Sequence, residues 1–175
     1  MRSISKKEDT MSGGKNLDDE VDCLTIFGKT KRVMRSLLGF RPAAYGLVTH
    51  DDKILLIRGR QNGKFCLPGG GINCGEPMLD ALHREIGEET GLKVKVGAFI
   101  AVRDGFNYFD PDGTAWHSIA LCWACTPLGD PYALVAGDPD EGAPVWVDVP
   151  ALREEDCHGH TWHTICVYLY GGMGE

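Results

Sequence analysis

The segment from Gly70 to Leu92 constrains the fold of this chain most, because it joins a glycine-rich loop to an amphipathic helix. The helix is predicted to begin at Pro77, a residue favoured in a first turn, and to end at Gly91, which suits the left-handed capping position. Its apolar positions have i, i+3, i+7 spacing and comprise Leu79, Leu82 and Ile86. A helix with one apolar stripe is expected to pack against a sheet or another helix.

The same helix is predicted to carry three carboxylates on one face, because Glu85, Glu88 and Glu89 have i, i+3, i+4 spacing. Like charges one turn apart destabilise a helix by about 0.2–0.5 kcal/mol per pair. A hard divalent cation would offset that repulsion. Carboxylate oxygens suit Mg²⁺ or Mn²⁺, and bound Mg²⁺ commonly contacts substrate phosphates.

The fixed spacing of this segment carries a family resemblance. Gly70, five residues, Glu76, seven residues and then the run 84–92 (REIGEETGL) match every fixed position of the Nudix box, so the chain resembles the Nudix hydrolases. The preceding FCLPGG, residues 65–70, looks like the lead-in of that family. The resemblance implies an α/β fold, specifically a Nudix-type α/β/α sandwich with a mixed β-sheet.

Strand and helix patterns outside the box are compatible with that fold. Apolar runs at 43–49 and 53–58 predict a hairpin, and further strands are expected at 65–67, 94–102, 117–126 and 144–149. Polar or turn-rich segments predict loops at 104–114 and 129–142. Helical spacing in the last part of the chain is shown by Trp162, Ile165, Cys166 and Leu169.

The length of 175 residues fits one domain with short flanking segments. We expect a flexible polar tail over residues 1–28, a short amphipathic helix over 29–41, the Nudix hydrolase domain over 42–171 and a tail over 172–175. The helix is predicted because apolar residues recur at helical spacing among basic ones, at Val33, Met34, Leu37 and Leu38.

The resemblance implies roles for individual residues of the box. Glu85, Glu88, Glu89 and Arg84 are expected to be catalytic, with the three glutamates and the Gly70 carbonyl holding the metal. Arg84 would orient Glu85, and Glu76 would fix the glycine loop. Which glutamate acts as the base stays open. A later acidic residue is also expected in the family, and Glu141, ahead of Asp138 and Asp140, is the candidate metal ligand; a solvated acidic loop explains these three equally well.

Substrate binding is expected mainly from residues outside the helix. The backbone of Gly69 and Gly70 can approach a ligand closely. Arg58 and Arg60 are candidates for contact with substrate phosphates, or are surface charges. Tyr108 belongs to an aromatic group that either stacks on a base or packs in the protein, with Phe106, Phe109 and Trp116.

These residues predict a Mg²⁺-dependent hydrolase, with Mn²⁺ as an alternative cofactor. Its substrate would be a small nucleoside diphosphate derivative: a nucleoside triphosphate, ADP-ribose or a nucleotide sugar, or a dinucleoside polyphosphate. One alternative is a catalytically silent domain that binds a nucleotide as a sensor. Another is an isoprenoid diphosphate isomerase, which would need a cysteine such as Cys66 or Cys74.

Charge and composition exclude several other classes. The net charge of −7 argues against non-specific binding to nucleic acid or to an anionic membrane. With no apolar run of about 18–20 residues, we expect a cytoplasmic protein with reduced thiols, and a homodimer is compatible with the sequence. A zinc site is a further alternative, carried by Cys122 and Cys125 or by the segment 157–166, which contains two cysteines and three histidines.

Overall fold

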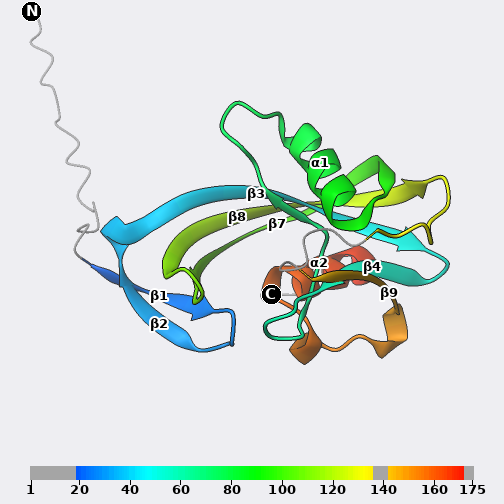
Figure 1. The fold of residues 1–175 in the computed structure, drawn as a ribbon. Helices are drawn as coiled ribbons and strands as arrows, with labels where there is room; N and C mark the ends of the chain where they lie inside the picture. Colours follow the sequence, from blue (N-terminus) through cyan, green and yellow to red (C-terminus); the bar gives the residue numbers. More distant parts are fainter. Residues whose placement is uncertain (1–18, 136–141, 172–175) are drawn as a thin grey trace, which may run out of the picture.

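The computed structural model describes residues 19–135 and 142–171 and has one mixed sheet with a helix on each face (Figure 1). The strands are β1 (Glu20–Thr25), β2 (Thr30–Met34), β3 (Leu38–His50), β4 (Lys53–Arg58), β5 (Phe65–Cys66), β6 (Gly69–Gly71), β7 (Lys93–Phe109), β8 (Thr114–Leu128) and β9 (Ala143–Asp148). The helices are α1 (Met78–Thr90) and α2 (Gly159–Tyr170), with 3-10 turns η1 (Arg35–Leu37), η2 (Val149–Ala151) and η3 (Glu154–Asp156).

The strand order is β2-β1-β7-β8-β3-β4-β5, with β6 paired to β3 and β9 paired to β4. Strands β3 and β8 run parallel, whereas β7 and β8 run antiparallel, so the sheet is mixed. In the described residues no helix is long and apolar enough to cross a membrane.

Two cores lie on opposite faces of the sheet. Leu82 and Ile86 of α1 pack with Val48 and Leu55, whereas Ile165 of α2 packs on the other side with Leu47, Ile54 and Leu56. Neighbouring residues of β3 and β4 therefore point to opposite faces, as strand geometry requires. This arrangement confirms the predicted α/β/α sandwich.

The predicted hairpin is confirmed as β3 and β4, which pair antiparallel from Val48 and Leu55 to the turn. Asp51 and Asp52 form that turn with φ values of 45° and 59°. Positive φ at both central residues is the requirement of a type I′ turn, and aspartate tolerates it better than most residues.

The box helix is also confirmed. Pro77 precedes α1, and Gly91 caps it with φ of 75° and an N–H bond of 3.0 Å to the Gly87 carbonyl. One member of the predicted apolar stripe is wrong: Leu79 is 41% exposed, and Ala81 lies in the core instead.

The predicted helix at 29–41 is wrong, because these residues form β2, η1 and the start of β3. Strand β2 pairs antiparallel with β1, where Val33 faces Val21, and β1 pairs parallel with β7. The tail predicted over 1–28 is wrong from Glu20 onward for the same reason. The apolar residues of segment 29–41 have helical spacing because the chain turns a corner between β2 and β3. Pairing with distant strands, and not local helix propensity, determines their structure. Residues 1–18 and 172–175 lie outside the described residues.

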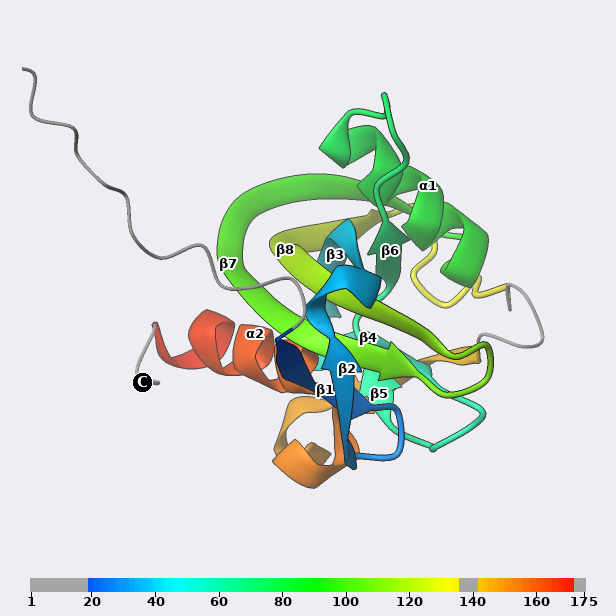
Figure 2. The ribbon, with the colours of Figure 1, turned by 90° about the vertical axis from the view of Figure 1, so that its left-hand side faces the viewer.

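The loop predicted at 104–114 is shorter than expected. Strands β7 and β8 extend to Phe109 and from Thr114, so only residues 110–113 form the turn. Strand β7 bends strongly (Figure 2). Its pairing with β8 shifts register between Val96 and Ala101, and such bulges let a strand bend. Strands β1 and β2, residues 20–34, form an N-terminal arm at the edge of the sheet (Figures 1 and 2).

Candidate active site

The glycine loop forms strand β6, which pairs with β3 so that Ala44 faces Gly70 and Tyr45 faces Gly69. A Cβ on Gly70 would lie 2.6 Å from Oε2 of Glu85, and a Cβ on Gly69, at φ of 139°, would lie 2.2 Å from the Ala44 carbonyl oxygen. Only glycine therefore allows the Glu85 carboxylate and β3 to approach this backbone so closely.

Arg84 organises the carboxylates around this loop. It donates to both oxygens of Glu76, from Nε at 2.8 Å and Nη2 at 2.9 Å. Its Nη1 donates to Glu85 Oε1 at 2.8 Å and to Glu88 Oε2 at 3.2 Å, while Nη2 also bonds the Gly71 carbonyl at 3.1 Å. The Arg84 guanidinium thus connects the glycine loop with two carboxylates of the helix, those of Glu85 and Glu88, through charge-assisted hydrogen bonds.

The Glu76 carboxylate closes the loop from the other side, accepting the Asn73 N–H at 3.0 Å. Hydrogen bonds from Arg84, and next from the Asn73 backbone, lower the pKa of Glu76 to about 2. Hydrogen bonds to Glu76 and then Glu85 raise the pKa of Arg84. Both groups are therefore charged throughout the physiological pH range, and the loop has a permanent ion pair at its base.

The three box glutamates differ in their surroundings. Glu89 accepts the Gly69 N–H at 2.8 Å through Oε2. The Glu85 side chain is 18% exposed, whereas Glu88 is 62% exposed. Glu88 is therefore the more accessible of these two Arg84-bound carboxylates, and Glu85 is the one held against the loop.

The residues beside Gly70 suit a hard divalent cation in their donor chemistry. The carboxylates of Glu85, Glu88 and Glu89 and the Gly70 carbonyl are oxygen donors, and the absence of a Cβ at Gly70 lets Glu85 Oε2 lie close to the Gly70 backbone. Within residues 19–135 and 142–171, however, no three His, Cys, Asp or Glu side chains already converge as metal ligands. Arg84 Nη1 bridges Glu85 and Glu88 instead. Glu141, with Asp138 and Asp140, lies outside the described residues.

A cavity of about 570 Å³ lies on the face of β3 opposite α1; we call it the sheet cavity. It is lined by the N-terminal arm, strands β3, β7 and β8, and the first residues of α2. Its floor is made of small residues, which are Ala43, Gly105, Ser118 and Ala120. Tyr45 lies between this floor and Gly69, so the cavity adjoins the glycine loop.

The NUDIX domain family matches residues 39–164. This chain belongs to the Nudix family.

Named relatives agree with that membership. An ADP-ribose pyrophosphatase from Methanocaldococcus jannaschii is 35% identical over 136 residues, covering 70% of this chain and 76% of the relative. An RNA pyrophosphohydrolase from Ruthia magnifica is 46% identical over 56 residues, 31% of each chain. The crystal structure of a MutT Nudix hydrolase from Burkholderia pseudomallei has a TM-score of 0.59 and 25% identity, covering 73% of this chain and 96% of its own. The Nudix resemblance is confirmed, and the protein is a Nudix pyrophosphohydrolase.

The structure brings most of the candidate Nudix site residues together. Glu85, Glu88, Glu89, Arg84, Gly69 and Gly70 form one cluster, and Tyr108 lines the sheet cavity. Arg58 instead lies over the Phe65 ring, with 5.7 Å between Cζ and the ring centroid. Neither Arg58 nor Arg60 belongs to the described lining of the sheet cavity.

Sequence reasoning missed Arg41, Tyr45 and Arg103, which all line the sheet cavity. Arg41, Ala43 and Tyr45 alternate along β3, and period-2 spacing was the signal that would have revealed them. For Arg41 the predicted helix over 29–41 conceals this alternation, because it separates Arg41 from the strand predicted at 43–49.

Cys66 and His160 are half-buried and in contact, with 3.4 Å between Sγ and Nε2, and His160 also lines the sheet cavity. The Tyr45 ring lies 4.5 Å from the His160 ring. Burial is the main cause that raises the pKa of Cys66 to about 12 and lowers the pKa of His160 to about 3. Both groups are therefore neutral at pH 7, and Cys66 is a poor nucleophile for an isomerase.

The zinc alternative gains no support from the described residues. Cys122 lies in the α2 core and Cys125 in the α1 core, on opposite faces of β8. No set of three metal-binding side chains converges in the described part of segment 157–166. All seven cysteines are free thiols, in line with the reduced state expected from the sequence.

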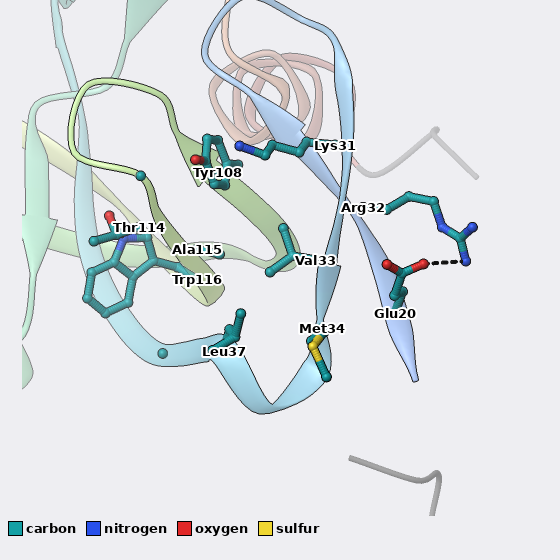
Figure 3. A pocket seen from close by; sticks show the side chains of 12 residues that line it. Glu20, Lys31, Arg32, Val33, Met34, Leu37, Tyr108, Thr114, Ala115 and Trp116 are labelled. Carbon is teal, nitrogen blue, oxygen red and sulfur yellow. Dashed lines mark hydrogen bonds and ion pairs between the residues drawn. The ribbon is translucent and has the colours of Figure 1, made fainter. Parts of the chain in front are cut away.

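A second cavity of about 560 Å³, the arm cavity, separates the N-terminal arm from the β7–β8 turn (Figure 3). Lys31 of the arm points at the Tyr108 ring, with 3.7 Å between Nζ and the centroid, and Glu20 pairs with Arg32 at 2.9 Å. Tyr108 and Trp116 line both cavities, so the arm helps to form the boundary of the sheet cavity.

Proposed function

We propose that this Nudix enzyme hydrolyses the pyrophosphate linkage of a nucleoside diphosphate derivative with Mg²⁺, or Mn²⁺, as its cofactor. The observation that carries the proposal is the gathering of Glu85 and Glu88 by Arg84 beside Gly70, next to a cavity of ligand size. The phosphates of a nucleotide would bind at the carboxylate cluster, and the rest of the nucleotide would bind in the adjoining cavity.

The chemistry of the reaction requires such a cluster. Water must attack phosphorus surrounded by negative oxygens, and a bound divalent cation neutralises those oxygens and lowers the pKa of water. Glu85, Glu88, Glu89 and the Gly70 carbonyl would hold the cation, and Glu141 is a further candidate ligand. One of the carboxylates takes the proton from the attacking water.

The remaining residues of the box would keep this cluster in place. Arg84 holds Glu85 at 2.8 Å, and Glu76 holds Arg84 through both of its oxygens. Glu89 holds the Gly69 N–H at 2.8 Å. Gly69 and Gly70 offer the substrate phosphates a backbone without side chains, which permits a close approach.

ADP-ribose is the first substrate to test, because the relative of that specificity matches most of both chains. The match to the RNA pyrophosphohydrolase covers only 31% of this chain and gives less support. Nucleotide sugars, nucleoside triphosphates and dinucleoside polyphosphates contain the same anhydride. A silent nucleotide sensor is disfavoured because every acid of the box is retained. Cytoplasmic location and a homodimer stay predictions.

A substrate panel tests this proposal. Purified protein is incubated with ADP-ribose, UDP-glucose, ATP and diadenosine tetraphosphate, with Mg²⁺, Mn²⁺ or EDTA, and products are separated by chromatography. We expect metal-dependent cleavage of at least one anhydride, with AMP and ribose 5-phosphate from ADP-ribose. Absence of product from all four substrates with both metals would contradict the proposal.

A further inference from the structure

The sheet cavity has a cationic residue on each of two opposite walls. In the sheet register Arg41 of β3, Ser118 of β8 and Gly105 of β7 form one row, and Ala43, Ala120 and Arg103 form the next. With strands about 4.8 Å apart and a rise of about 3.4 Å per residue, the Cα atoms of the two arginines are roughly 12 Å apart across β8. The small floor residues between them leave a space that a planar ligand group can enter.

These two arginines lack a carboxylate partner within the described part of the chain. The ion pairs there within 4.0 Å involve other cations, and the two acids of the cavity lining have their own partners. Asp104 contacts His117 at 3.4 Å, and Asp112 accepts from Thr114 at 2.7 Å. Unpaired guanidinium groups in a protein of net charge −7 give this cavity a local attraction for anions.

Arg41 connects the glycine loop with an aromatic wall. A Cβ on Gly71 would lie 3.1 Å from Arg41 Nε, so the guanidinium packs directly on the loop. Its Cζ lies 5.8 Å from the centroid of the Trp116 ring. The Trp116 ring packs against Gly39, where a Cβ would meet it at 2.5 Å, so its position is restrained.

The residues of β6 alternate between the catalytic cluster and this cavity. Gly70 borders Glu85, whereas Gly69 borders Tyr45 and Gly71 borders Arg41. Because these three residues carry no side chains, only the thickness of a backbone separates the carboxylates from the cavity. A phosphate at this strand is therefore within reach of both Arg41 and the box.

We propose that the sheet cavity binds the nucleoside monophosphate half of the substrate, with Arg41 contacting its phosphate and Trp116 contacting its base. This assignment rests on the proposed hydrolase function and specifies how the same site selects its substrate. Arginine offers a planar fork to phosphate oxygens, and every base offers an aromatic face to tryptophan. Tyr45, Phe106, Tyr108 and Phe109 also line the cavity.

Equilibrium binding tests the assignment without turnover. AMP and, separately, ribose 5-phosphate are titrated in EDTA into wild type, Arg41→Ala, Arg41→Lys and Lys95→Ala, followed by calorimetry. Wild type is expected to bind AMP more tightly than ribose 5-phosphate. Arg41→Ala should weaken AMP binding by about 10- to 100-fold, the value of charged hydrogen bonds, with Arg41→Lys in between. Lys95→Ala removes an exposed cation from the same strand as Arg103 and should match wild type.

Tryptophan fluorescence locates the base. AMP should change the tryptophan emission of wild type. Trp116→Phe should abolish that change, because Trp116 is the tryptophan in the described lining of the cavity. Calorimetry should still detect AMP binding to this variant. Binding of AMP that is unchanged in Arg41→Ala, or a fluorescence change that survives in Trp116→Phe, would overturn the assignment.

Steady-state kinetics separates this assignment from the hydrolase proposal. With ADP-ribose, Arg41→Ala should raise KM by about 10- to 100-fold with kcat within twofold, since the contact is present in ground and transition states alike. Turnover by Arg41→Ala at the wild-type KM refutes the cavity assignment alone. Arg41-dependent AMP binding without hydrolysis of any substrate refutes the hydrolase proposal alone.

Discussion

Arg84 has the central position among the individual residues of the site, because its guanidinium bonds Glu76, Glu85, Glu88 and the Gly71 carbonyl at once. The Nudix box predicted this cluster from spacing alone, since helix geometry places its carboxylates on one face. Spacing gave no information about the contacts of Arg58 or Arg41, whose surroundings come from other strands.

The Glu76–Arg84 pair predicts a pH-dependent stability difference. Because the folded pKa of Glu76 is lowered to about 2, the pair stabilises the protein above the unfolded pKa of about 4.3, and this contribution is lost as pH falls toward 2. Glu76→Gln should therefore lower Tm at pH 7 and approach the wild-type Tm near pH 2. Thermal unfolding followed by circular dichroism measures both; a constant difference across this range would contradict the account.

Gly70 predicts a loss of activity without a matching loss of stability. In Gly70→Ala the new Cβ would lie 2.6 Å from Glu85 Oε2 and displace that carboxylate. Displacement of a reacting group by about 1 Å costs about 100-fold in rate, so we expect kcat to fall by that order. Gly87→Ala is the matched control, because its Cβ would meet only the Leu92 carbonyl oxygen at 4.0 Å, and it should keep wild-type kcat.

At the level of secondary structure elements, α1 was predictable because its start, stop and apolar stripe are local signals. The N-terminal arm was not, because β2 is stabilised by pairing with β1, and β1 by pairing with β7, far along the chain. The full lengths of β7 and β8 were not predictable for a similar reason. Residues 104–109 and 114–117 resemble a loop in sequence, but they lie in the paired ends of β7 and β8.

Helix α1 contains one destabilising residue, Gly87, and the structure has room for a larger side chain at this position. Gly87 lies in the helix interior, with only the Leu92 carbonyl oxygen near the position of a Cβ. Gly87→Ala should raise the free energy of unfolding by about 0.5–1 kcal/mol, through helix propensity. Urea denaturation measures the change, and an unchanged or reduced midpoint would show that α1 needs glycine there for another reason.

In the molecule as a whole, the cluster of Arg84 and the box glutamates and the sheet cavity adjoin the two sides of β6, and the N-terminal arm bounds the cavity through residues 24–26. The family match begins at residue 39, so the arm lies outside it. The arm is therefore a feature of this chain that influences the cavity without contributing to the box.

The Lys31–Tyr108 contact is predicted to hold the arm in place. Lys31→Ala removes a cation–π contact of about 0.5–1 kcal/mol, equivalent to roughly a two- to fivefold change. Amide hydrogen exchange in residues 20–34 should speed up, and KM should rise by a similar factor with kcat unchanged. Unaltered exchange in the arm would show that the strand pairing alone secures it.

The α1 carboxylates beside Gly70 are proposed to carry out metal-dependent hydrolysis. The most direct test is kcat of wild type and Glu88→Gln with Mg²⁺ and the best substrate of the panel, with folding checked by circular dichroism. Glu88 is the exposed carboxylate of the Arg84 cluster, and its charge would act on the metal or the attacking water. We expect a folded variant with kcat lowered by about 100-fold or more. Equal turnover by the two proteins would contradict this proposal.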